Sequence, residues 1–325
     1  MRRSASEKME IIRIVQDSEL GVKRTLEELG IIRSTFYTWY GRYLQEGFDG
    51  LKPKETKRKS FWNKIPEKER QQVVEIALEK TELSPRELAF HITDKQGWFI
   101  SESSVYRILK ERGLITSPAW ILMAASDEFK DKTTYVHQQW QTDFTYFKII
   151  GWGWYFLSTI MDDYSRYIIS WELCKNMESA DAMRSVEDAL QKAGLPESNR
   201  PRLLSDNGSC YISNEFNAFI SEKEMGHVRG APYHPQTQGK IERYHRSMKN
   251  VVKLENYFYP DDLRAKLESF VNYYNNERYH ESLKNVTPAD VYFGREKEIL
   301  HQRKNVKIET IKERRKVNQE LEISA

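Results

Sequence analysis

The chain has 325 residues, of which 30% are charged and 39% hydrophobic, and its formal net charge is +3. This length predicts at least two domains, each with a core of its own. The sequence has no run of about 18 apolar residues and no apolar N-terminal stretch, so we expect a cytoplasmic protein without a membrane partner. Two cysteines are too few for a disulfide framework or a cysteine-based zinc site.

The small net charge hides a segregation of charge along the chain. Residues 121–227 hold 10 Lys and Arg against 16 Asp and Glu, whereas residues 228–254 hold 6 basic residues and one acid. Residues 1–120 hold 22 basic residues against 18 acidic ones. An acidic region between basic segments is typical of a metal site beside phosphate-binding surfaces, although a local imbalance can also arise by chance.

Residues 1–50 are predicted to form three short helices, the last of which begins near Ser34, a favourable N-cap residue. A helix, a turn that contains Gly30 and a second helix form the pattern of a helix-turn-helix, whose second helix can enter the major groove of DNA. The alternative is a three-helix bundle without a role in DNA binding. The expected DNA-reading face consists of Ser34, Thr35, Thr38 and Arg42.

A second segment of this kind is predicted at residues 63–115, after a basic linker at residues 51–62. Ser84–Glu87 has the sequence of a capping box with proline at the first helical position, and Ser101 is expected to cap a further helix. The outward-facing residues of that helix, which we expect to contact DNA, are Tyr106, Arg107 and Lys110. Two modules in tandem would allow a long DNA sequence to be recognised. Residues 116–134 show no clear period and are predicted to be a linker.

The hydrophobic period changes to that of strands from residue 135 onward. Three segments rich in aromatic and β-branched residues predict antiparallel strands at Trp140–Phe147, Trp154–Met161 and Arg166–Leu173. A helix that ends at Gly194, a short buried strand at residues 202–205 and another helix follow. This order predicts an α/β core with a mixed sheet and flanking helices at residues 135–254. A helical part at residues 255–294 completes the core, and residues 295–325 form a charged tail that contacts DNA, contacts a partner or stays solvated.

Three carboxylates stand in short, distinct motifs: Asp143 in WQTDFTYF, Asp206 in LLSDNGS and Glu242 in GKIERYHR. The first two end apolar, strand-like runs, and the third lies on a predicted helix. Three acids at one point would repel each other unless a divalent cation neutralised them. Hard oxygen ligands near a phosphate favour Mg²⁺, for which Mn²⁺ can substitute. The pattern therefore predicts metal-assisted phosphodiester chemistry on a nucleic acid.

The predicted helix at residues 240–253 has two separate stripes when it is drawn at about 100° per residue. The apolar stripe consists of Ile241, Tyr244, Met248, Val251 and Val252. The exposed stripe consists of Glu242, Arg246, Lys249 and Lys253. An ion pair between Glu242 and Arg246 would contribute only about 0.2–0.5 kcal/mol and leaves the later positive charges unexplained. A DNA backbone along the helix explains them, and His234 in the preceding loop could donate to a phosphate.

Other acids are predicted to have structural roles. Asp162 and Asp163 follow a strand and are expected to stabilise the turn before Arg166. Thr287 to Asp290 has the sequence of a helix cap. None of these acids is expected to bind a metal.

Five segments together carry a family resemblance: WQTDFTYF, DDYSRYIISW, SDNGS, PYHPQTQGKIERYHRSMK and YYNNERYHESLKNVTPADVYFG. They resemble the integrase-core transposases of bacterial insertion sequences, relatives of the retroviral integrases in the ribonuclease-H-like superfamily. The resemblance is strong over residues 135–294 and looser over residues 1–115, and the 35 residues between Asp206 and Glu242 are a specific part of it. Gln238 stands where asparagine is common in the family. The His-His-Cys-Cys set of the retroviral zinc domain is absent, and the helix-turn-helix modules take its place.

The resemblance implies a DDE transposase with a ribonuclease-H-like core. Its catalytic metal ligands would be Asp143, Asp206 and Glu242, with two Mg²⁺ ions per active site. The DNA contacts expected in this region are Lys240, Arg243, Arg246, Lys249, Lys253 and His234. The enzyme would bind the terminal inverted repeats of a mobile element as double-stranded DNA, cleave the 3′ ends and join them to target DNA. It would act in the bacterial cytoplasm as a homo-oligomer, at least a dimer on DNA.

Two other functions are compatible with parts of the sequence. A catalytically silent DNA-binding regulator derived from such an enzyme would be favoured by the loss of an acid, and none is lost. A nuclease of the same fold without sequence preference would have no need of two reading modules.

Overall fold

The computed structural model describes residues 4–18, 20–52, 62–115, 132–230, 238–253, 255 and 257–323. The chain divides into two compact units, residues 1–61 and 62–325. The finer domain boundaries stay predictions. None of the helices in the described ranges is long and apolar enough to cross a membrane.

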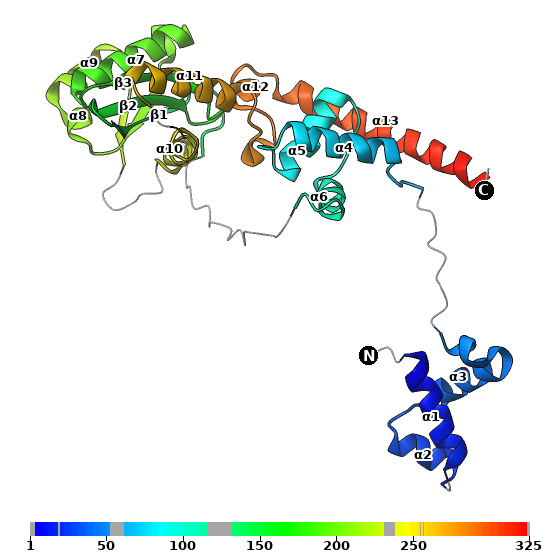
Figure 1. Ribbon diagram of the computed structural model, residues 1–325. Coiled ribbons are helices and arrows are strands. Elements are labelled where there is room, and N and C mark those ends of the chain that lie inside the picture. The colour runs from blue at the N-terminus through cyan, green and yellow to red at the C-terminus, as the bar shows by residue number, and fades with distance from the viewer. Residues whose placement is uncertain are drawn as a thin grey trace. The chain divides into compact units, whose positions relative to one another are not determined.

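The N-terminal unit contains α1 (Ala5–Asp17), α2 (Val22–Glu28), α3 (Arg33–Glu46) and the 3₁₀ helix η1 (Gly47–Leu51) (Figure 1). Its buried core consists of Ile12, Val15, Leu26, Ile31, Phe36 and Leu51. The prediction that Ser34 caps α3 is wrong, because α3 begins at Arg33 after Ile32, which makes no side-chain capping bond. The turn before α3 is set by Gly30, with φ +63°, and by the hydrogen bond from Ile31 N to Leu26 O, so the chain enters the helix before the serine.

A second helical module opens the larger unit. It contains α4 (Glu67–Glu79), α5 (Pro85–His91), the π-helical segment η2 (Ile92–Gln96) and α6 (Glu102–Glu111). The capping box at Ser84 and the N-cap at Ser101 are both confirmed. The helices pack around Val73, Leu88, Ile92, Ile100, Val105 and Ile108.

The C-terminal residues form the 28-residue helix α13 (Glu296–Ile323), which lies along the second helical module (Figure 1). Arg314 is 4% exposed, and its guanidinium donates to Glu69 and to the carbonyl of Phe99, both at 2.7 Å. Further along, Asn318 donates to the backbone carbonyls of Trp62 and Lys64. The tail therefore has a structural contact within its own chain.

The sheet of the core has five strands in the order β3-β2-β1-β4-β5. Its strands are β1 (Gln139–Ile149), β2 (Gly153–Asp162), β3 (Ile168–Cys174), β4 (Arg202–Ser205) and β5 (His227–Arg229). The first three pair antiparallel, whereas β4 and β5 run parallel to β1. The predicted mixed sheet is confirmed. Strand β5 was not predicted, because its three residues show no apolar alternation.

Helices cover both faces of this sheet. On one face, α7 (Ser179–Ala193), α8 (Ser209–Ile212) and α9 (Asn214–Glu222) enclose a core around Trp140, Ile160, Val186, Leu203 and Phe216. On the other face, α10 (Gly239–Val252) and α11 (Pro260–Asn276) enclose a core around Leu157, Met161, Ile241, Tyr244 and Leu267. Helix α10 therefore lies across the sheet from α7 and α9 (Figure 1). Three short helices complete the described part: η3 (Glu197–Asn199), η5 (Glu281–Leu283) and α12 (Pro288–Tyr292).

Candidate active site

Asp143 lies in the middle of β1, just beyond the part of the strand that pairs with β4. Strand β4 pairs with β1 only at Gln139–Gln141, and in the described part of the chain no strand pairs with β1 beyond Gln141 on that side. The amide of Gln238 donates to the carbonyls of Thr142 at 3.2 Å and Leu204 at 3.3 Å, which ties β1 to β4 where they separate. Asp143 is consequently rigidly placed and partly exposed, with 20% of its side chain accessible.

Asp206 follows the last residue of β4. Its Oδ1 accepts a hydrogen bond from Gly208 N at 2.9 Å, and a Cβ at residue 208 would lie only 2.9 Å from that oxygen. The surrounding protein desolvates the carboxyl and raises the pKa of Asp206. The Gly208 N–H lowers this pKa, and the charge of Asp143 raises it further. Asp143 and Asp206 are therefore close enough to repel each other.

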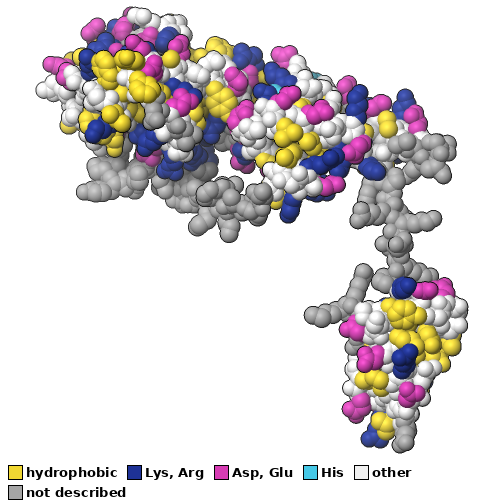
Figure 2. Space-filling model, viewed as in Figure 1, with side chains coloured by type: hydrophobic (Ala, Val, Ile, Leu, Met, Phe, Trp, Pro, Cys, Tyr) yellow, Lys and Arg dark blue, Asp and Glu magenta, His cyan; other side chains and the backbone are white. Residues whose placement is uncertain are grey.

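Helix α10 brings the third acid to the same region. Glu242 is exposed, and it shares with Asp143 a depression of about 350 Å³. The other lining residues are Thr145, His245, Arg246, Lys249, Asn250 and Lys253. Lys and Arg side chains gather over α10 in Figure 2. Burial and the charge of Lys253 lower the pKa of Lys249, while Asp143 opposes this shift. The structure thus groups two of the predicted acids with three of the predicted basic residues.

His245 is a member of the site that sequence reasoning missed. It is 5% exposed, with Nδ1 3.2 Å from Asp143 Oδ2 and Nε2 3.2 Å from Thr159 Oγ1. The histidine therefore bridges β1 and β2 and fixes one oxygen of Asp143. On the wheel of this helix it falls at about 140°, between the two stripes, where the pattern assigned no role. Val251, predicted to face the core, is 39% exposed.

Lys240 occupies a different position from the other cations. Its ammonium donates to Asp163 Oδ2 at 2.6 Å and to Asp163 O at 2.8 Å, and its side chain is 24% exposed. DNA would have to compete with Asp163 for the Lys240 ammonium, or bind it together with Asp163. The predicted contacts at Lys240 and Arg243, which is exposed, stay predictions. His234 lies outside the described residues.

The three acids fit a hard divalent cation by their chemistry, since each offers carboxylate oxygens. Among the residues that the structure describes, however, no three His, Cys, Asp or Glu side chains are grouped so that they could hold one metal ion. Asp143 interacts with Asp206 on one side and shares the depression with Glu242 on the other. The predicted ligand set is brought to one surface but is not assembled.

The helix-turn-helix residues are placed on exposed surfaces of their modules. Ser34, Thr38 and Arg42 are exposed on α3, and Thr35 is partly buried. On α6, Arg107 and Lys110 are exposed, and the Lys110 ammonium lies 5.8 Å from the Tyr106 ring centroid.

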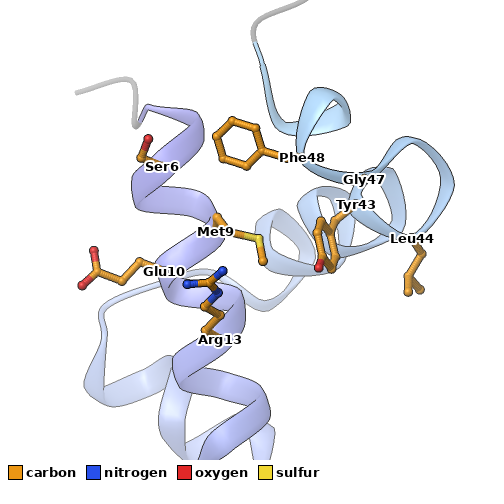
Figure 3. Close-up of a pocket in the computed structure, with 8 residues that line it drawn as sticks. All are labelled: Ser6, Met9, Glu10, Arg13, Tyr43, Leu44, Gly47 and Phe48. Atoms are coloured by element: carbon orange, nitrogen blue, oxygen red, sulfur yellow. The ribbon is translucent and has the colours of Figure 1, made fainter.

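The N-terminal unit also contains a depression of about 900 Å³ (Figure 3). Residues of α1, of the end of α3 and of the start of η1 line it: Ser6, Met9, Glu10, Arg13, Tyr43, Leu44, Gly47 and Phe48. It has a single acid, Glu10, and therefore lacks the paired carboxylates of the site on the sheet.

Models of known families match both the sheet-containing core and the N-terminal helical modules. Residues 134–235 and 223–288 match models described as integrase core domain. Residues 134–288 therefore match an integrase core domain. Residues 7–60 match a helix-turn-helix domain, and residues 35–109 match a homeodomain-like domain. The integrase core and the N-terminal helix-turn-helix regions recognised in the sequence are confirmed.

Among curated proteins, the Gag-Pro-Pol polyprotein of squirrel monkey retrovirus is 32% identical over 117 residues, 35% of this chain. The intracisternal A-particle Pol-related polyprotein of mouse intracisternal a-particle MIA14 is 44% identical over 54 residues, 16% of this chain. In both cases the match spans only 6% of the relative's length.

Among solved structures, the integrase catalytic core domain of HTLV-2 in complex with magnesium is 20% identical, with a TM-score of 0.39. The match covers 49% of this chain and 97% of that domain. The simian T-cell lymphotropic virus intasome bound to a PP2A regulatory subunit is 21% identical, with a TM-score of 0.44, and the match covers 68% of this chain and 74% of that one.

Proposed function

We propose that the chain is a DDE transposase that binds the ends of a mobile element, cleaves them at the 3′ strand and joins them to target DNA. The observation that carries this proposal is the shared depression of Asp143 and Glu242, with Asp206 within electrostatic reach and a row of cations along α10. Carboxylates beside a DNA phosphate repel it unless a cation lies between the two. Integrase cores use divalent metal ions, which would fill this role.

The residues of the site divide the work. Arg246, Lys249 and Lys253 would bind consecutive backbone phosphates and hold the scissile one beside Glu242. His245 would keep Asp143 in one orientation. Two Mg²⁺ ions held by Asp143, Asp206 and Glu242 would supply activation of the attacking water or 3′-hydroxyl and neutralisation of the leaving oxygen.

Binding of the element's ends is assigned to the helical modules. The exposed residues of α3 and α6 would read the terminal repeats in the major groove, because each lies on the second helix of a helix-turn-helix. Joining two ends in one reaction requires at least two copies of the chain on double-stranded DNA.

A catalytically silent regulator is the second candidate. It is favoured by the finding that no three-acid group is assembled within the described residues. The two candidates differ in one result, because a regulator would bind the same DNA ends and leave them uncut.

The test is cleavage and strand transfer by the full chain in Mg²⁺, on DNA ends taken from the sequence that flanks its gene. Asp143→Asn, Asp206→Asn and Glu242→Gln should each lower the cleavage rate by at least about 10³-fold, since each removes a ligand needed only for chemistry. Affinity for the ends in a gel-shift assay should change by less than about threefold, because none of the three removes a phosphate contact.

Glu215→Gln, which alters an exposed acid on α9 across the sheet, is the matched control and should keep the wild-type rate. Mn²⁺ binding, followed by calorimetry without DNA, should weaken in the three site variants and not in the control. A near-normal rate in any one of the three would overturn the assignment. A wild-type protein that binds the ends and cuts none of them in any metal would be the regulator.

A further inference from the structure

An exposed group of aromatic residues lies on the β1–β2 hairpin, beyond the acids. Tyr146 is 58% exposed and Trp154 is 51% exposed. Their rings meet edge to face, with centroids 5.4 Å apart. Exposed aromatic rings in contact with each other mark binding surfaces more often than they serve a core. A purely structural role as a cross-strand pair would not require half of each ring to face solvent.

Two lysines flank this pair of rings. The ammonium of Lys249 lies 4.5 Å from the centroid of Tyr146, and that of Lys148 lies 5.6 Å from the centroid of Trp154. The order across the surface is therefore cation, ring, ring, cation. We name Tyr146, Lys148, Trp154 and Lys249 the hairpin surface.

The hairpin surface and the proposed active site share one residue, Lys249. Lys249 lines the depression that holds Asp143 and Glu242 and also contacts Tyr146. Tyr146 is three residues after Asp143, about 10 Å along β1, and because side chains alternate along a strand it points to the other face of the sheet, so Lys249 of α10 reaches its ring around the edge of β1. Among the described residues, β4 pairs with β1 only as far as Gln141 and not with the part of the strand between the acids and the rings.

The ligand follows from the chemistry of the surface. Ring faces flanked by cations suit the flat faces of bases on a phosphate chain, and stacking of this kind needs bases that are not paired in a duplex. A protein partner fits less well, since lysine is depleted at the centres of protein interfaces, whereas here it adjoins both rings.

We propose that the hairpin surface stacks unpaired bases at the DNA end whose scissile phosphate lies at Asp143 and Glu242. This inference rests on the proposed function. It assigns to Tyr146 and Trp154 the capture of a frayed end, while the cations of α10 hold the duplex backbone. The surface would thus favour an end whose terminal pairs have opened.

The experiment compares two DNA ends of equal length in EDTA, one fully paired and one with three unpaired nucleotides that carry 2-aminopurine. Wild-type protein should bind the unpaired end more tightly and quench the 2-aminopurine fluorescence on stacking. The double variant Tyr146→Ala and Trp154→Ala should lose about tenfold or more of this preference and most of the quenching. Its affinity for the paired end should stay within about twofold.

Two control variants separate stacking from structure. The double variant Tyr146→Phe and Trp154→Phe keeps both rings and should keep the preference. Tyr135→Ala removes an aromatic residue of the same core that is 57% exposed, and it should have no effect. Equal preference in the wild type and the double alanine variant, both folded by circular dichroism, would overturn the proposal. So would a double alanine variant that changes only the sedimentation of the protein, because the surface would then bind a second copy.

The measurement in EDTA is independent of cleavage. Asp143→Asn should abolish cleavage and retain the preference for unpaired ends. If the wild type cleaves no DNA but shows the preference and the quenching, the proposed function fails and the stacking surface stands.

Discussion

Two pairs of acids on the same sheet differ in how their oxygens are used. Asp162 ends β2 and Asp163 follows it, and the two are 0% and 5% exposed. Asp162 accepts from His137 N and from both the N–H and the hydroxyl of Ser165, at 2.6 to 2.8 Å. Asp163 accepts from Gln141, Thr133 and Lys240 at 2.5 to 2.6 Å.

Asp143 and Asp206 have far fewer partners. One oxygen of Asp143 faces His245, and Asp206 accepts one backbone N–H from Gly208. Both sit where strands β1 and β4 separate, and the charge of Asp143 raises the pKa of Asp206. Asp162 and Asp163 therefore stabilise the fold, whereas Asp143 and Asp206 have oxygens available to a ligand. The predicted turn role of Asp162 before Arg166 is confirmed by its bonds to Ser165.

The largest effect is expected at Asp162, where a substitution should lower the stability of the fold. Asp162→Ala would leave the His137 N–H and the Ser165 N–H without a partner in a buried place, and we expect a loss of about 2–4 kcal/mol in the free energy of unfolding. Urea denaturation of the full chain measures it. Asp261→Ala, at an acid whose side chain is 94% exposed, should change the free energy by less than about 0.5 kcal/mol. If Asp162→Ala lowered the free energy of unfolding no more than Asp261→Ala, Asp162 would not have the structural role assigned to it.

A second, smaller effect is expected at His245, which contacts Asp143 and Thr159. His245→Ala frees the Asp143 carboxylate to rotate, so cleavage should fall about 10–100-fold with little change in affinity for DNA. Mn²⁺ affinity should weaken as well, which a merely structural defect would not cause. His245→Asn can restore one amide group near Asp143 and should recover part of the rate.

Thr159→Val provides the matched control for this positioning role. It removes the partner of His245 Nε2 and leaves the Asp143 contact in place, so the loss should be only a few-fold. An alanine variant that cleaves normally and binds Mn²⁺ normally would show that Asp143 needs no such support.

Long, patterned elements were predictable from the sequence. Strands β1 to β3 and the buried stripe of α10 follow from aromatic, β-branched and helical periods, which tertiary packing reinforces. Strand β5 was not predictable, because three residues held by pairing with β4 carry no period of their own. The partner of α13 was not predictable either, since Arg314 and Asn318 meet residues more than 200 positions away.

At the site, the sequence predicted the three acids and the cations but not how they are held. His245 was missed because a histidine between two stripes has no signature, and its role depends on Thr159 and Asp143 in neighbouring strands. The engagement of Lys240 by Asp163 was missed for the same reason. Pairings between distant segments are decided by the fold and leave no local trace in the sequence.

The smallest expected effect is the pH dependence that Asp206 gives to the stability of the folded protein. The folded protein raises the pKa of Asp206 above 3.8, mainly through desolvation, so the native state binds this proton more tightly than the unfolded chain does. The free energy of unfolding must then fall as the pH rises from the unfolded pKa through the folded one, and the loss persists at neutral pH.

Asp206→Asn has no proton to lose and should be slightly more stable than the wild type at pH 7, with a rise in Tm of about 2 °C or less. Below pH 3.8 the two proteins should have the same Tm. Calorimetric scans at pH 7 and at pH 3.5 check this, with Asp188→Asn as an acid on α7 for comparison. A lower Tm for Asp206→Asn at pH 7 would mean that the carboxylate supports the fold as Asp162 does. A higher Tm together with lost cleavage would mean that the chain retains an acid at this position at the expense of its own stability.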